Sequence, residues 1–147
     1  MTKQSIYVVT RAKLELHGAA RTAAGRTIFQ DKKLFLLFVR LERAKQTHDI
    51  EIIKKSVQEI GLYLDGINKY YLILFAYMYA LFSDYSTARQ LPELLENGWT
   101  RYKTDHSRPL SDEERTIHDW AGHMFHRYSN HFRRALREAE ARRRPPA

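Results

Sequence analysis

The longest apolar run in the chain, YYLILFAYMYALF at residues 70–82, limits what this sequence can fold into. The run is shorter than the roughly 20 residues of a membrane-spanning helix, so we expect no transmembrane segment and a helix buried in a protein core. A helix without a polar face must be covered on all sides, by its own chain or by another subunit. We therefore predict a central helix at about residues 67–85, whose tyrosine hydroxyls need hydrogen-bond partners or water.

Elsewhere the apolar residues recur every three or four positions, which is typical of amphipathic helices, and no stretch alternates like a β-strand between hairpin turns. Helices are predicted at residues 4–24, 27–46 and 50–64, with Asp49 as the N-cap of the third. A short helix beginning at Pro92 and a connection over residues 99–110 follow. Four residues of the first helix are expected to face the core: Ile6, Val9, Leu16 and Ala20.

The last predicted helix, at about residues 112–143, begins with a capping box. Ser111 and Glu114 have the spacing in which each side chain caps the other's backbone. Acidic residues at its start and arginines at its end both favour the helix dipole. The sequence thus predicts an all-α bundle of five or six helices in one domain, residues 1–144, and a short proline-rich tail at 145–147.

The charge is concentrated at the two ends of the chain. The formal net charge is +8, and residues 1–26 and 101–147 each contribute +4, so an anionic partner such as nucleic acid is indicated. The absence of cysteine excludes disulfides, thiolate metal sites and cysteine nucleophiles. The first residues lack the apolar core of a signal peptide, and we expect a cytoplasmic protein.

Arginines in the last helix form the leading candidate site. Guanidinium groups suit phosphate contacts because they donate paired hydrogen bonds. The basic N-terminal residues could extend this surface if the two ends of the chain meet: Lys3, Arg11, Lys13, Arg21 and Arg26. The predicted nucleic-acid-binding residues are Arg127, Arg133, Arg134, Arg137, Arg142, Arg143 and Arg144.

The same helix carries one metal-site candidate. Asp119, His123 and His126 lie within about 60° of one another around a helix, and two histidines with a carboxylate can bind iron or zinc. One helix alone rarely completes such a site, and the apolar stripe lies on the other side. A polar outer face is the preferred interpretation, and we expect no cofactor.

An arginine and a histidine separated by four intervening residues occur twice, as Arg43 with His48 and as Arg101 with His106. This six-residue spacing resembles the catalytic motif of the HEPN ribonucleases, which are small all-helical proteins. The resemblance implies metal-free RNA cleavage at a dimer interface, with arginine stabilising phosphate charge and histidine transferring protons. Arg101 and His106 fit better because they lie in a long connection. The family usually has a polar residue after the arginine, whereas Ala44 and Tyr102 stand here.

The favoured hypothesis is a non-catalytic, basic helical subunit that contacts nucleic-acid backbone within a larger assembly. The chain contains no phosphate loop, dinucleotide fingerprint, zinc-protease motif or serine-hydrolase elbow. One alternative is the HEPN-like ribonuclease. The other is a protein-binding module, such as an immunity, inhibitor or secretion-accessory protein, or a homo-oligomer whose apolar helix lies at a subunit interface.

Overall fold

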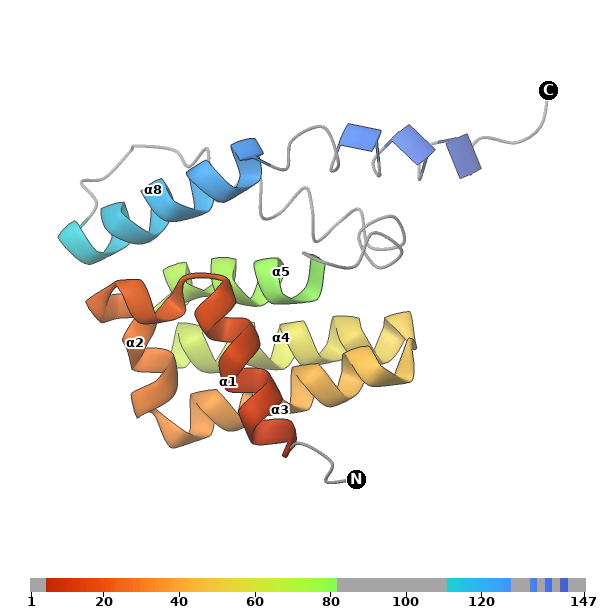
Figure 1. Ribbon diagram of the computed structural model, residues 1–147, viewed down its shortest axis with the longest axis horizontal. Coiled ribbons are helices and arrows are strands. Elements are labelled where there is room, and N and C mark those ends of the chain that lie inside the picture. Colours follow the sequence, from red (N-terminus) through yellow and green to blue (C-terminus); the bar gives the residue numbers. More distant parts are fainter. Residues whose placement is uncertain (1–4, 82–110, 128–132, 135–136, 139–140, 143–147) are drawn as a thin grey trace.

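The computed structural model describes residues 5–81, 111–127, 133–134, 137–138 and 141–142 (Figure 1). In this part, 88% of the residues are helical and no strand occurs, so the all-α prediction is confirmed. No helix among these residues is long and apolar enough to cross a membrane. The described elements are α1 (Ile6–Leu16), η1 (Ala19–Arg21), α2 (Ala23–Gln30), α3 (Lys32–Thr47), α4 (Ile50–Gly66), η2 (Tyr70–Leu72), α5 (Ile73–Leu81) and α8 (Asp112–Arg127).

The first helix is shorter than predicted and buries a different face. Gly18 has φ 85°, a left-handed conformation that ends α1 and separates it from the 3₁₀ helix η1. Leu14 is fully buried, whereas Leu16 is 72% exposed, so the prediction that Leu16 faces the core is wrong. Ala20 is exposed as well. Because the chain turns at Gly18, the helical periodicity cannot be carried from α1 to the residues that follow.

The predicted helix at residues 27–46 is divided at Asp31. The backbone of Asp31 is extended, and its carboxylate accepts a hydrogen bond from the N–H of Leu34 at 3.1 Å, which makes it the N-cap of α3. The preceding helix, α2, begins earlier than expected because the hydroxyl of Thr22 caps the N–H of Gly25 at 2.9 Å. An N-cap residue within a run of helically spaced apolar residues thus ends one helix and begins the next, although the apolar spacing continues.

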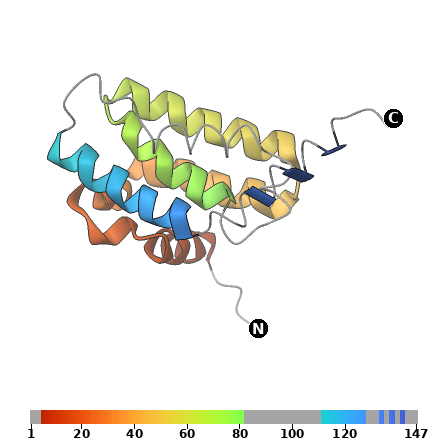
Figure 2. The same cartoon turned by 90° about the horizontal axis from the view of Figure 1, so that it is seen from above.

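The helices α3 and α4 form an antiparallel pair that matches the predicted pattern (Figures 1 and 2). The turn between them places His48 in the left-handed region at φ 57°, and Asp49 caps α4 through the N–H groups of Glu51 and Ile52. The apolar positions predicted for α4 face the core: Ile53, Val57, Ile60 and Leu64 are buried and Ile50 is half-buried.

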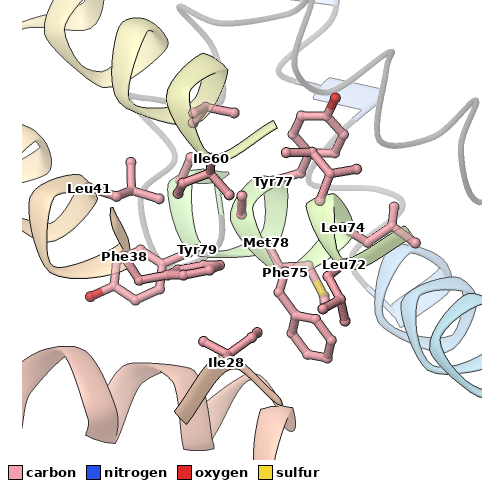
Figure 3. Packing of buried hydrophobic residues seen from close by; sticks show 14 of the residues in the cluster. Ile28, Phe38, Leu41, Ile60, Leu72, Leu74, Phe75, Tyr77, Met78 and Tyr79 are labelled. Atoms are coloured by element: carbon pink, nitrogen blue, oxygen red, sulfur yellow. The ribbon is translucent and has the colours of Figure 1, made fainter. Parts of the chain in front are cut away.

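The apolar run begins with η2 and continues as α5. Asn68, at φ 59°, separates it from α4, so the helix starts later than the predicted residue 67, and residues 82–85 lie outside the described part. All nine residues of α5 are buried within the one chain. Figure 3 shows side chains from the preceding helices packed around α5, with the ring of Phe38 beside that of Tyr79.

The helix α8 begins as predicted. The hydroxyl of Ser111 accepts a hydrogen bond from the N–H of Glu114 at 3.1 Å, and Ile117 is fully buried. The helix packs on α2, η2 and α5, and the hydroxyl of Tyr71 donates to the Glu113 carboxylate at 3.1 Å. Residues 133–134, 137–138 and 141–142 are helical. The continuity of the predicted helix to residue 143, the short helix at Pro92 and the connection at 99–110 lie outside the described residues.

Candidate functional site

The predicted basic surface is described at four positions. Arg133, Arg134, Arg137 and Arg142 are all exposed. Arg134 forms an ion pair with Glu138, one helical turn later, at 3.2 Å. Ion pairs between solvent-exposed side chains contribute little free energy, so this pair is weak. Among the other predicted residues, Arg127 is the last residue of α8, and Arg143 and Arg144 lie outside the described part.

The N-terminal basic residues are largely used within the fold. The Lys13 ammonium donates to the buried carboxylate of Glu42. The Arg11 guanidinium pairs with Glu15 at 3.3 Å and lies 4.7 Å from the centre of the Phe29 ring. Arg26 donates to the carbonyl oxygen of Ala20 at 3.2 Å, and Lys3 is outside the described residues. Lys13 therefore adds less to an anion-binding surface than its charge implies, whereas the side chains of Arg11 and Arg26 remain exposed.

The metal-site candidate is not assembled in the described part of the chain. Asp119 and His123 are exposed on α8, which agrees with the interpretation as a polar outer face. His126 lies on the same helix. Across the described residues, no group of three or more histidine, aspartate or glutamate side chains could hold a metal ion.

The ribonuclease candidate residues Arg101 and His106 lie outside the described residues. The second copy of the spacing, Arg43 with His48, lies at the end of α3, where both side chains are exposed. His48 there forms the turn into α4 as the C-cap of α3. That position gives His48 a structural role in the turn.

A buried polar cluster, which sequence reasoning did not find, joins α1, α3 and α5. Its centre is Glu42, which is only 2% exposed. The carboxylate accepts three hydrogen bonds: from the ammonium of Lys13 at 2.6 Å, the hydroxyl of Tyr79 at 2.8 Å and the amide of Gln46 at 2.9 Å. A buried carboxylate is tolerated only with such partners. The cluster comprises Lys13, His17, Glu42, Lys45, Gln46 and Tyr79.

Two lysines and a histidine surround the ring of Tyr79. The ammonium groups of Lys13 and Lys45 lie 5.9 and 5.6 Å from the ring centre, and Lys45 also donates to the Tyr79 carbonyl oxygen at 2.8 Å. The ring of His17, a residue that is 5% exposed, meets the Tyr79 ring edge-on at 6.1 Å. An aromatic ring attracts both nearby cations and the edge of a second ring. The Tyr79 ring therefore stabilises the polar cluster as well as the hydrophobic core.

The titration behaviour of the cluster points to a structural role. Burial alone would raise the pKa of Glu42, but the hydrogen bonds from Lys13, Tyr79 and Gln46 outweigh it and hold this pKa below its ordinary value. Burial and the hydrogen bond to Glu42 raise the pKa of the Tyr79 hydroxyl. A general acid or base works best with a pKa near the operating pH, and these two groups are moved away from it. The hydrogen bonds of the cluster therefore connect α1 to α3 and α5.

The sequence did contain a signal for this cluster. Glu42 follows Phe38 by four residues on the apolar stripe of α3, and a carboxylate in such a stripe requires a buried cation or hydroxyl. The need of the α5 tyrosines for partners was predicted, but the pairing of Tyr79 with Glu42 depends on tertiary packing.

No protein-family model, curated protein or solved structure matches the chain in comparisons with known proteins.

Proposed function

We propose that this protein is a basic helical subunit that binds nucleic-acid backbone through its C-terminal arginines, as part of a larger assembly. The proposal treats residues 1–144 as one helical domain with α5 at its centre. The observation that supports it best is the exposure of Arg133, Arg134, Arg137 and Arg142, four arginines within ten positions. Phosphate contacts from such residues give affinity without reading base sequence.

The distribution of the other cations supports the same choice. Lys13 pairs with the buried Glu42, and Arg11 and Arg26 are exposed but make contacts within the fold, whereas the four C-terminal arginines are exposed within ten positions of one another. Net positive charge of +8 also favours association with a polyanion at moderate ionic strength. Binding of this kind depends on counterion release and weakens steeply with salt.

The test compares two double variants that remove the same charge. Arg133→Ala/Arg137→Ala removes exposed C-terminal arginines, and Arg11→Ala/Arg40→Ala removes arginines that are paired with Glu15 and Glu59. Binding of labelled single-stranded RNA, single-stranded DNA and duplex is measured by fluorescence anisotropy at two salt concentrations. We expect the C-terminal variant to bind about tenfold more weakly than the wild type and the control variant to bind nearly as well.

Equal losses in the two variants would contradict a C-terminal site and leave only a general charge effect. No binding at low salt would reject the proposal and favour the protein-binding module. Incubating the RNA in the same mixtures tests the ribonuclease alternative, which requires cleavage that His106→Ala abolishes.

A further inference from the structure

The helix α1 is held to the rest of the protein by a narrow contact. Its buried side chains are Thr10 and Leu14, and its polar contacts include the pair of Lys13 with Glu42 on α3 and the Arg11 guanidinium over the Phe29 ring of α2. The opposite face is exposed, including Val8 at 56%. The C-cap residue of α1, His17, is buried against Tyr79 of α5. The polar cluster thus supplies the buried charged contact between α1 and the rest of the protein.

The surroundings of His17 oppose a positive charge on its ring. The charged and titratable groups of the cluster are Lys13 from α1, Glu42 and Lys45 from α3, and Tyr79 from α5. The Glu42 carboxylate already accepts three hydrogen bonds, one of them from Lys13, and the second ammonium group, that of Lys45, donates to the carbonyl oxygen of Tyr79. His17 is 5% exposed, and a proton on its ring would add a third positive charge beside the two ammonium groups, so the folded attachment requires a neutral ring.

We propose that the buried cluster of Lys13, His17, Glu42 and Tyr79 is an acid-sensitive latch, in which a proton on His17 releases α1 while the pair of α3 and α4 remains folded. The released helix would withdraw Leu14 from the core and uncover the part of α3 and α5 that it covers. The contact between α3 and α4 does not pass through His17, which is why the release is expected to be local.

The direction of the pKa shifts determines the pH range in which α1 is released. Burial, followed by the charges of Lys45 and Lys13, lowers the pKa of His17 from 6.5 to about 4. The released helix therefore takes up a proton more readily than the attached helix, and attachment weakens as the pH falls from about 6.5 towards 4. At pH 5.0 the shift corresponds to about 30-fold weaker attachment. The pKa of Glu42 is also lowered, but its stabilising effect is lost only below its ordinary value of 4.5.

The experiment is amide hydrogen exchange of the whole protein at pH 7.5 and pH 5.0, corrected for the pH dependence of intrinsic exchange. Peptides from α1 are compared with peptides from α4, in the wild type, in His17→Phe and in the control His48→Asn. His48 is exposed, and asparagine tolerates its left-handed backbone. We expect protection of α1 to fall about 30-fold in the wild type and the control, and less than about threefold in His17→Phe, while α4 changes much less.

Three results would overturn the latch. Protection of α1 that is unchanged between the two pH values shows that no acid release occurs. An equal fall in α1 and α4 shows global unfolding in place of a local release. A fall that persists in His17→Phe shows that another group takes up the proton. If His17→Phe does not fold, the comparison of α1 with α4 in the wild type still decides between local release and its absence.

Discussion

Replacing Glu42 with glutamine tests whether the polar cluster stabilises the fold. Glutamine has nearly the same shape, but it removes the charge and turns one acceptor atom into a donor. The carboxylate receives hydrogen bonds from Lys13 and Tyr79 on the same oxygen, Oε1, so an amide oxygen there could keep both in weaker form. Charge-assisted hydrogen bonds are about twice as strong as neutral ones, and each of the two would lose about 1 kcal/mol. The third bond, from the exposed Gln46 amide to Oε2, is kept if that amide rotates to present its oxygen to the new NH2 group, so it adds no further loss.

The expected loss of unfolding free energy is therefore about 2 kcal/mol. It falls below the roughly 3–5 kcal/mol of a fully buried ion pair because the Lys13 side chain is 41% exposed and can turn to water. The assay is urea denaturation at pH 7.5 followed by circular dichroism. With a slope of about 2 kcal/mol per molar urea, the midpoint should fall by about 1 M.

Glu59→Gln is the matched control for this variant. Glu59 also pairs with a cation, Arg40 at 3.2 Å, but both side chains are about half exposed. Such pairs contribute roughly 0–1 kcal/mol, so the midpoint should hardly move. If Glu42→Gln costs no more than Glu59→Gln, the cluster does not hold α1, α3 and α5 together in the way argued from its geometry.

Two further predictions concern small side chains. Gly25→Ala should lower stability by about 1–3 kcal/mol in urea denaturation, because an added Cβ would collide with the carbonyl oxygen of Ala19; an unchanged midpoint would show that the turn into α2 yields easily. Ser56→Ala should raise the thermal midpoint by about 2–4 °C, since the serine hydroxyl is buried without a hydrogen-bond partner in the described part of the chain and alanine favours the helix. A lower midpoint would reveal a partner for that hydroxyl.

Helices whose signals are local were predictable from the sequence. Asp49 caps α4, its apolar residues repeat at helical spacing and face the core, and Ser111 begins α8 as the capping box indicated. The apolar run of α5 required burial, and it is buried. In these cases the local preference and the tertiary packing favour the same conformation.

The N-terminal third was less predictable because competing local signals occur there. Asp31 lies inside an apolar helical pattern, yet it ends one helix and caps the next. Leu16 continues the apolar spacing of α1, but the turn at Gly18 directs the chain so that Leu14 and His17 are covered instead. Only the packed structure decides between such alternatives.

The candidate sites likewise include residues that the sequence predicted and residues that it did not. The exposure of Arg133 and Arg137 was expected from their place in a polar, basic segment. The cluster around Glu42 joins residues 13, 42 and 79, whose distances along the chain exceed any helical spacing. Composition and periodicity do not predict such contacts. A carboxylate on the apolar stripe of a helix indicates only that one of the two partners is present.

The measurement that tests the central claim most directly is the salt dependence of binding to labelled single-stranded RNA. If the four exposed arginines of residues 133–142 neutralise phosphates, the logarithm of the binding constant should fall linearly with the logarithm of salt concentration, with a slope of about −3. Arg133→Ala/Arg137→Ala should reduce the magnitude of that slope by about 1.4, at about 0.7 for each lost contact. Failure to bind at low salt, or binding that is insensitive to salt, would contradict the account.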